Sequence, residues 1–293
     1  MRPTSLSRQK IRALIAEGEY SLAEGPHPER ARRDAETLLL HLFRRNDPDR
    51  SRAWLIAHWN NPTDHGAEFR ALIERRRAGE PIQYILGESE FYGFPFAVTR
   101  DVLIPRPETE HLVEKTIELA TCFAAPRIVD IGTGSGAIAV ALAAKLPQAA
   151  ITATDLSAAA LALARQNAKR NGVAGSIHFL QGDLLAPVDK ACFEIVVSNP
   201  PYVPVDDCPS LAVEVREYEP PQALFAGADG LDVYRRLIPA AFAALVPSGF
   251  LALEIGFGQS EAVRALLAAS GFVEVEFTPD LQDIPRVAAA LRP

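Results

Sequence analysis

Hydrophobic positions along the chain follow two different rhythms, and the change between them divides the sequence. Near the N-terminus, apolar side chains recur at intervals of three and four residues, the spacing of one helix face. Proline residues stand between or after these segments, where helices must stop. Residues 1–80 are therefore predicted to form a small helical bundle. Its apolar positions are Ile11, Leu14, Ile15, Leu38, Leu39, Leu42, Phe43, Phe69, Leu72 and Ile73.

Residues 82–104 have a different composition. The stretch "IQYILGESEFYGFPFAVTRDVLI" is rich in aromatic and β-branched residues and contains two glycines. Such a composition favours a short β-hairpin. We therefore expect residues 81–105 to be a hairpin linker between two domains.

From residue 106 onward, apolar runs of strand length alternate with helical patterns. Strands are predicted in "RIVDI", "AAITATD", "SIHFLQGD", "FEIVVSN" and "GFLALEIG". This alternation is typical of a Rossmann-like α/β fold, a doubly wound and mostly parallel sheet. Residues 106–293 are expected to form this second domain. Ligands of such sheets bind outside the carboxyl ends of the strands.

Composition argues against a membrane or secreted protein. At 293 residues and 48% hydrophobic content, the chain can bury a large core. Charge or proline breaks its apolar stretches well short of the roughly 18–20 residues that a membrane helix needs. No secretory signal pattern follows Met1. We expect a cytoplasmic protein without a membrane partner.

Charge is distributed unevenly. Residues 1–79 hold 15 Lys and Arg against 11 Asp and Glu, a net charge of +4. The remaining residues carry a net charge of −11, which gives the total of −7. An acidic main body is a poor match to a phosphate backbone, so no direct nucleic-acid partner is expected. The runs Arg32-Arg33 and Arg75-Arg76-Arg77 have two interpretations, either solvated helix faces or a docking surface for an acidic macromolecule.

Residues that hold metals or form thiolates do not cluster in the sequence. Cys122, Cys192 and Cys208 have no C-x-x-C spacing, and the six histidines include no pair at i, i+4. We expect no disulfide framework, no cysteine nucleophile and no metal site.

A glycine-rich motif, "GTGSG", follows the first predicted strand of the second domain. Glycines there let the backbone approach a ligand, and the next helix offers free N–H groups. A turn that merely packs helix on strand is the alternative. Ala137 stands where a dinucleotide fingerprint has its third glycine, which argues against a nicotinamide oxidoreductase. The motif comprises Gly132, Thr133, Gly134, Ser135 and Gly136.

Two carboxylates end the next predicted strands. Asp155 lies 23 residues after Gly132, near the offset of about 20 at which a carboxylate accepts ribose hydroxyls. Asp183 could accept from an exocyclic adenine amine, with Leu184 covering the ring. Capping of the next turn is the alternative role for Asp183. The pattern indicates a nucleoside ligand.

The tetrapeptide Asn199-Pro200-Pro201-Tyr202 follows the fourth predicted strand. Its prolines lack N–H groups and fix the backbone, so a planar NH2 group could donate to both the Asn199 side-chain oxygen and the Pro200 carbonyl. Tyr202 offers a ring against which a planar amide could pack. Such acceptors would stabilise positive charge growing on nitrogen as it attacks an electrophilic methyl group. No strong general base is needed, because the alkylated nitrogen becomes acidic.

Together these motifs resemble the class I S-adenosylmethionine methyltransferases that act on planar nitrogens. The segments "PIQYILGESEFYG", "VLIPRPETE", "VSNPPYVP" and "EYEPPQALFAGADGLDVYRRL" are similar to the HemK/PrmC family of peptide chain release factor glutamine methyltransferases. The resemblance spans nearly the whole chain, strongly in residues 81–255 and weakly in the N-terminal bundle.

This resemblance implies an activity and its partners. Methyl transfer from S-adenosylmethionine, with S-adenosylhomocysteine as product, is expected at N5 of the glutamine in the Gly-Gly-Gln motif of class I peptide chain release factors. The helical domain would grip this protein substrate, residues 106–293 would be the methyltransferase catalytic domain, and we expect a monomer.

The resemblance also implies roles for single residues. The "GTGSG" loop, Asp155 and Asp183 would bind the cofactor, with Leu184 beside its adenine. Asn199, Pro200, Pro201 and Tyr202 would hold the glutamine amide, and Asn199 would also face the methyl donor. Arg106 and Glu108 of "IPRPETE" would shape the substrate pocket.

Three other functions remain in view. A related enzyme that methylates a ribosomal-protein glutamine would share the chemistry. A methyltransferase for exocyclic amines of DNA or RNA would need a larger basic region. An inactive cofactor-binding module would be expected to have lost Asn199 or a glycine. The chain departs from the family pattern in "DLQDIPRV", residues 280–287, where a Gly-Arg-Asp-Arg-like turn is common, so the conformation of this turn stays open.

Overall fold

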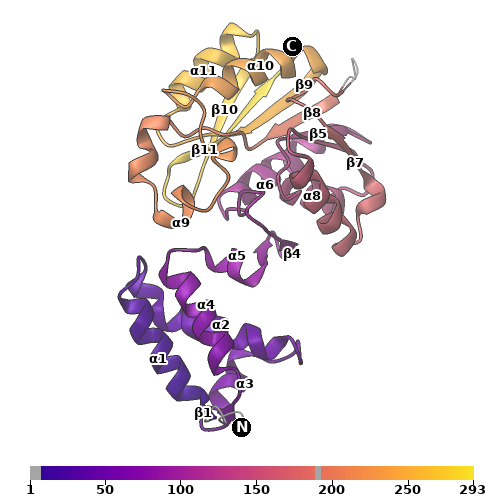
Figure 1. The fold of residues 1–293 in the computed structure, drawn as a ribbon. Coiled ribbons are helices and arrows are strands. Elements are labelled where there is room, and N and C mark those ends of the chain that lie inside the picture. The colour runs from indigo at the N-terminus through magenta and orange to yellow at the C-terminus, as the bar shows by residue number, and fades with distance from the viewer. Residues whose placement is uncertain (1–7, 189–192) are drawn as a thin grey trace. The chain divides into compact units, whose positions relative to one another are not determined.

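The computed structural model describes residues 8–188 and 193–293, and the chain divides into two units (Figure 1). One unit contains residues 8–87 together with 212–218, and the other contains residues 88–211 and 219–293. The sequence predictions for the segment after Met1 and for Cys192 lie outside the described residues.

The first unit is the predicted helical bundle. Every apolar position that the helical spacing singled out is buried in one cluster, to which Leu22, Leu55 and Ile85 also belong. A single shared core explains why these short amphipathic helices are stable, since isolated helices of this length are marginal in water. The helices are α1 (Ile11–Ala23), α2 (Ala31–Arg44), α3 (Arg52–Ala57), α4 (Gly66–Arg77) and α5 (Ile82–Leu86), with the short strands β1 (Gln9–Lys10) and β2 (Pro62–Thr63) beside them.

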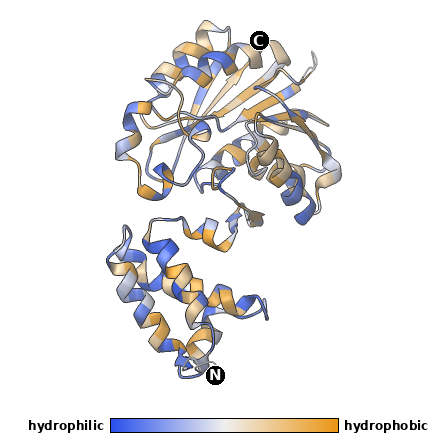
Figure 2. Cartoon of the chain, viewed as in Figure 1, coloured by the Kyte–Doolittle hydropathy of each residue, from blue (hydrophilic) through white to orange (hydrophobic). Residues whose placement is uncertain are grey.

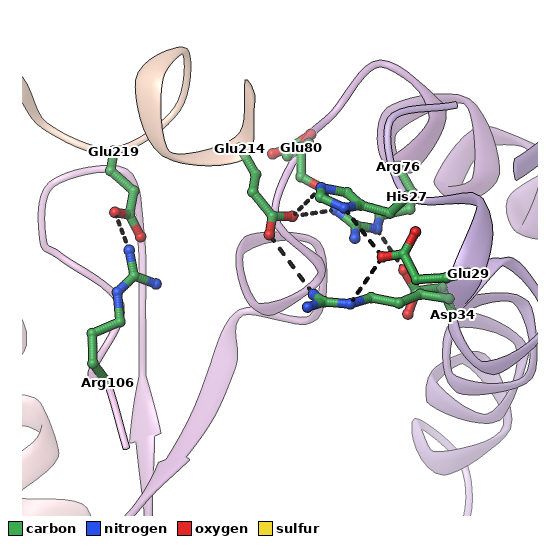
Figure 3. Close-up of polar contacts among 9 residues, drawn as sticks. His27, Glu29, Asp34, Arg76, Glu80, Arg106, Glu214 and Glu219 are labelled. Carbon is green, nitrogen blue, oxygen red and sulfur yellow. Dashed lines mark hydrogen bonds and ion pairs between the residues drawn. The ribbon is translucent and has the colours of Figure 1, made fainter. Parts of the chain in front are cut away.

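A distant segment of chain completes this unit. Residues 212–218, which contain the one-turn helix α9 (Val213–Arg216), pack with the N-terminal helices. Glu214 accepts a hydrogen bond from Arg76 Nη1 at 2.8 Å, and its carboxylate lies 3.1 Å from His27 Nε2 (Figure 3). The Tyr218 hydroxyl donates to the Ala78 carbonyl at 3.1 Å. The chain therefore leaves the second unit for seven residues and returns at Glu219.

Both interpretations of the basic runs placed their arginines on the surface, and both are wrong for Arg76 alone; Arg32, Arg33, Arg75 and Arg77 are exposed. Arg76 is 3% exposed, and its Nε donates to Asp34 at 2.7 Å. Arg75 pairs with Glu80 at the edge of the same unit. A cation held by two carboxylates inside the bundle stabilises the unit and offers no docking charge.

The linker begins with a helix, in contrast to the prediction for residues 82–104. Helix α5 starts after Pro81 and ends at Gly87, whose φ of +76° favours glycine. The expected hairpin follows as β3 (Glu88–Phe91) and β4 (Phe94–Ala97), which pair antiparallel. The apolar residues before Gly87 pack into the bundle core, which explains why their β-like composition was misleading.

The second unit contains the predicted doubly wound sheet, and the fold class is confirmed. Its parallel strands are β5 (Arg127–Ile131), β6 (Ala150–Asp155), β7 (Ile177–Gln181), β8 (Phe193–Ser198) and β9 (Leu245–Glu254). They lie in the order β9-β8-β5-β6-β7, so the chain moves outward from β5 on one side and then returns to build the other. The reversal falls between β5 and β8, the place where such sheets bind ligands.

Helices cover both faces of this sheet. Ile128 points to the face covered by α6 (Thr109–Ala120), α7 (Ala137–Lys145) and α8 (Ala158–Arg170), while Val129 points to the face covered by α10 (Asp232–Ala244) and α11 (Ser260–Ala269). Figure 2 shows the strands as a hydrophobic layer between these helices. Burial on both faces accounts for the continuous apolar runs in the sequence.

Two C-terminal strands extend the sheet beyond the prediction. The strand β11 (Pro285–Leu291) runs antiparallel to β9, and β10 (Val273–Pro279) runs antiparallel to β11. The alanine-rich β11 gave no strand signal, although Val287 to Ala290 are buried. The turn at residues 280–284 is closed by Asp280, which accepts from the Ile284 amide at 3.1 Å and from Arg286 Nε at 2.9 Å.

The buried cation yields a stability prediction. The change Arg76→Ala is expected to lower the free energy of unfolding of the helical unit by about 3–5 kcal/mol, because Asp34 and Glu214 lose their shared cation. The chain's two tryptophans, Trp54 and Trp59, both lie in this unit, so tryptophan fluorescence during urea unfolding reports on it.

A neighbouring arginine supplies the matched control. The Arg77 side chain is 43% exposed and pairs with Glu24 at 3.3 Å. Arg77→Ala is therefore expected to cost less than about 1 kcal/mol, as exposed ion pairs do. Equal losses for the two variants would contradict the role assigned to the Arg76 cluster.

Candidate active site

The pairing of β5 with β8 brings two predicted motifs together. Ile131 and Ser198, the last residues of these strands, are register partners, and Ser198 Oγ donates to the Ile131 carbonyl at 2.7 Å. Gly132 and Asn199 follow these partners directly. The glycine-rich loop and the Asn-Pro-Pro-Tyr segment therefore leave the sheet side by side.

A cavity of about 560 Å³ lies at this edge of the sheet, within the second unit. Its size falls in the range of small-molecule sites. Most residues predicted from the sequence line it: Arg106, Gly132, Thr133, Gly134, Ser135, Asp155, Asp183, Leu184, Asn199, Pro200 and Pro201. Three predicted site residues are not among the lining residues: Glu108, Gly136 and Tyr202.

Backbone amides of the glycine-rich loop donate hydrogen bonds to the last two residues of β6. Gly134 N–H donates to Asp155 Oδ2 at 2.8 Å. Gly136 has a φ of +82°, and a Cβ there would lie 3.1 Å from the Ala164 Cβ and 3.2 Å from the Ala164 Cα. Gly136 thus allows α8 to approach the loop closely.

A buried carboxyl group contacts the start of this loop. Asp130 is fully buried, and Thr133 Oγ1 donates to its Oδ2 at 2.6 Å. Burial raises the pKa of Asp130 to about 7. This contact fixes Thr133 at the start of the loop.

Asp155 presents its carboxylate at the cavity wall. In addition to Gly134, the amide of Ser157 donates to Asp155 Oδ1 at 2.8 Å. Each oxygen retains acceptor capacity for a ligand hydroxyl, so the group fits a ribose diol. The next residue, Leu156, is 67% exposed and also lines the cavity, although sequence analysis did not single it out.

Asp183 and Leu184 lie at the same edge, after β7. The Asp183 carboxylate contacts the guanidinium of Arg236, another lining residue. Leu184 has a φ of +51°, and its carbonyl accepts from Thr154 Oγ1 at 3.0 Å. The predicted contacts of these two residues with adenine stay predictions, and Asp183 would have to share its acceptors with Arg236.

Asn199 lies at the cavity wall with its side-chain amide engaged on one side. Its Nδ2 donates to Thr109 Oγ1 at 3.1 Å. The Tyr202 carbonyl accepts from Gln259 Nε2 at 2.9 Å, which fixes the end of the Asn-Pro-Pro-Tyr segment. The Tyr202 ring packs into the hydrophobic cluster under α10 and α11, so its predicted contact with a substrate amide stays a prediction.

Thr109 and Glu254 are site residues that sequence analysis missed. Thr109 lines the cavity, and its Oγ1 is 2.6 Å from Glu254 Oε2. Glu254 is 2% exposed, and the Tyr202 hydroxyl donates to its Oε1 at 3.2 Å. Burial raises the pKa of Glu254 to about 7. The signals in the sequence were a glutamate inside the apolar run "FLALEIG" and the place of Thr109 in the "IPRPETE" segment.

Arg106 and Glu108 differ in their placement. Arg106 lines the cavity, and its Nη2 lies 2.5 Å from the buried carboxylate of Glu219 (Figure 3). Glu108 is exposed and forms the N-cap of α6. The structure thus supports a pocket position for Arg106, whereas Glu108 suits the helix dipole.

Two further features are absent from the described residues. Across residues 8–188 and 193–293, no three His, Cys, Asp or Glu side chains gather in a way that could hold a metal ion. In the same described ranges, no helix has the length and apolar character of a membrane span.

Comparison with known sequences identifies both parts of the chain. Residues 13–87 match the model of the PrmC N-terminal domain, and residues 109–213 match the model of the methyltransferase small domain. Release factor glutamine methyltransferase of Bordetella pertussis is 47% identical over 244 residues, which cover 82% of this chain and 88% of that protein. Its counterpart in Moorella thermoacetica is 42% identical over 285 residues, which cover 96% of this chain and 98% of that protein.

Solved structures support the fold. The hMettl16 catalytic domain, in complex with a MAT2A 3'UTR hairpin, superposes with a TM-score of 0.57 at 16% identity, covering 78% of this chain and 80% of that one. At this identity the likeness concerns the fold alone. The relatives at 42–47% identity, by contrast, match over most of their own length. The resemblance inferred from the sequence is therefore confirmed: the chain belongs to the S-adenosylmethionine-dependent release factor glutamine methyltransferases.

Proposed function

We propose that this protein methylates N5 of the glutamine in the Gly-Gly-Gln motif of class I peptide chain release factors, with S-adenosylmethionine as donor. The observation that carries the proposal is the position of Asn199, whose carboxamide lines the same cavity as the glycine-rich loop. A nucleoside donor and a planar amide can therefore be held within one cavity. Relatives named release factor glutamine methyltransferase supply the acceptor class.

The cofactor would be held by the loop and the carboxylate that follows β6. Asp155 would accept the ribose hydroxyls, Gly134 and Ser135 would approach the remainder of the molecule, and Leu156 and Leu184 would cover the adenine. S-adenosylmethionine supplies an electrophilic methyl group when bound. The apolar lining excludes water and strengthens each polar contact with the ligand.

The acceptor amide would lie against Asn199 and Pro200. One amide hydrogen would go to Asn199 Oδ1 and the other to the Pro200 carbonyl, which fixes the nitrogen. Both acceptors stabilise the positive charge that grows on this nitrogen. The nitrogen then releases a proton without a strong base, because alkylation makes it acidic.

The remaining assignments concern the setting of the reaction. Residues 1–80 would recognise the release factor, residues 81–105 would link the domains, and residues 106–293 would carry out the transfer. The mechanism involves no metal ion and no direct nucleic-acid partner, and we propose a cytoplasmic monomer. Arg106 would shape the acceptor side of the cavity, with Glu108 supporting the start of α6.

Mass spectrometry tests the reaction directly. An unmethylated class I release factor, incubated with the protein and S-adenosylmethionine, is expected to gain one methyl group at the Gly-Gly-Gln glutamine. A release factor with alanine in place of that glutamine is the control and should gain none. Methylation of both factors, or of neither, would contradict the proposal.

The change Asn199→Ala is expected to lower kcat by roughly 100-fold or more, since Asn199 acts mainly in the transition state. Cofactor affinity, measured by titration calorimetry, should change little. An equal loss of cofactor affinity would contradict the role given to Asn199.

The change Asp155→Ala is expected to weaken S-adenosylmethionine binding by about 1.5–3 kcal/mol, the range for a hydrogen bond to a charged group. Calorimetric dissociation constants of the variant and the wild type give this difference. An unchanged constant would limit Asp155 to its contacts with the Gly134 and Ser157 amides.

A further inference from the structure

A continuous hydrogen-bond chain runs from the cavity wall into the core of the catalytic unit. Asn199 Nδ2 is 3.1 Å from Thr109 Oγ1, which is 2.6 Å from Glu254 Oε2. The other carboxylate oxygen, Oε1, is 3.2 Å from the Tyr202 hydroxyl. The hydrogen bonds therefore connect three elements: the loop after β8, which carries both Asn199 and Tyr202, the start of α6 and the end of β9.

We propose that Thr109 and Glu254 are positioning residues, which hold the Asn199 carboxamide with its oxygen toward the substrate amide. This inference rests on the proposed function, because it assumes that Asn199 accepts a hydrogen bond from the substrate. Thr109 and Glu254 act through Asn199, and the proposal gives them no contact with the transferred methyl group.

The hydrogens available along the hydrogen-bond chain determine which group donates in each hydrogen bond. An ionised Glu254 has only acceptors, so the Thr109 and Tyr202 hydroxyls must both donate to it. Thr109 Oγ1 then has no hydrogen left for Asn199 and can only accept. Asn199 must therefore turn its NH2 group to Thr109 and its Oδ1 away from it.

The opposite orientation would disable the site as proposed. A carboxamide oxygen and its NH2 group have nearly the same shape, so packing alone distinguishes them poorly. With the NH2 group toward the substrate, two amide donors would face each other. Thr109 supplies the acceptor that makes this orientation unfavourable.

Burial, hydrogen bonds and nearby charges together determine the pH at which Glu254 is ionised. Burial raises the pKa of its carboxyl group to about 7, Glu108 at the start of α6 adds to the rise, and Arg286 on β11 opposes it. The two hydroxyl donors, Thr109 and Tyr202, also favour the ionised form. Burial raises the pKa of Tyr202, so this residue stays a donor in the neutral range.

One further tyrosine packs against this group. The Tyr234 hydroxyl, from α10, donates to the Glu254 backbone carbonyl at 2.8 Å. Burial raises its pKa as well, so Tyr234 stays protonated. Both tyrosine hydroxyls therefore keep their protons in the neutral range, in which the Glu254 carboxyl group itself is expected to titrate.

The change Thr109→Val tests this hydrogen-bond chain, since valine keeps the shape of the threonine side chain and removes its hydroxyl. We expect kcat to fall roughly 10-fold, equivalent to the loss of one hydrogen bond, with little change in KM for the release factor or in cofactor affinity. Thr109→Ser restores the hydroxyl and should recover kcat to within about threefold of the wild type.

A second threonine on the same helix is the matched control. Thr116 is fully buried, and its hydroxyl donates only to the Leu112 carbonyl at 2.7 Å. Thr116→Val removes a buried hydroxyl from α6 without touching the chain to Asn199, so kcat should stay within about twofold. Equal kcat for Thr109→Val and Thr116→Val would overturn the proposal, as would a failure of Thr109→Ser to recover activity.

A pH profile provides an independent readout. As pH falls through about 7, Glu254 gains a proton, one hydroxyl can no longer donate to it, and the orientation of Asn199 is released. Wild-type kcat is therefore expected to decrease with falling pH and to level off above about pH 8. Glu254→Gln should have a low kcat that no longer depends on pH between 6 and 9.

Two results of this experiment would contradict the proposal. One is a flat wild-type profile. The other is a profile that persists in Glu254→Gln, which would assign the titration to another group, such as Asp130. If Glu254→Gln fails to bind S-adenosylmethionine and so is not correctly folded, the kcat values of Thr109→Val, Thr109→Ser and Thr116→Val decide.

Failure of this inference can be told apart from failure of the proposed function. Loss of activity in Asn199→Ala, together with full activity in Thr109→Val, would reject the positioning role of Thr109 and Glu254 and would leave the proposed methyl transfer in place. Full activity in Asn199→Ala would reject the role of Asn199 itself.

Discussion

The hydrogen-bonded pairing of β5 with β8 is the constraint on which the rest of the active site depends. It sets Ile131 beside Ser198, and the loops that follow these residues therefore begin side by side. One loop has the backbone freedom that a bound nucleoside needs, and the other has proline-fixed acceptors. A register shift of one residue would move one loop by about 3.3 Å along its strand and turn the side chains of that strand to the opposite face. The mostly parallel sheet thus sets the loop that we propose for the cofactor beside the segment that we propose for the acceptor amide.

Each unit also contains a buried polar group that is held by several hydrogen-bond partners. In the catalytic unit, Glu254 is satisfied by two hydroxyl donors, and one of them continues to Asn199. In the helical unit, Arg76 is satisfied by Asp34 and Glu214. Both groups cost energy to bury and remain acceptable because each has more than one partner. The same low-polarity surroundings that make them costly also make them specific in orientation.

The sequence predicted the features that depend on neighbours in the chain. Periodicity located the bundle core and the five parallel strands, and motif chemistry located the loop of Gly132 and the segment of Asn199. Contacts between distant residues were not predictable. Thr109 meets Glu254 across 145 positions, and Arg76 meets Glu214 across 138. The strand β11 was missed because its alanines carry little β-propensity and become a strand only through burial beside β9.

The most direct test of the account is a crystal structure of the protein with S-adenosylhomocysteine and a class I release factor. We predict that the Gly-Gly-Gln amide nitrogen lies within about 3.2 Å of both Asn199 Oδ1 and the Pro200 carbonyl oxygen, the usual limit for such hydrogen bonds. Ribose hydroxyls should lie on the Asp155 carboxylate. A glutamine whose carbonyl oxygen faces Asn199, or one bound outside this cavity, would contradict the account.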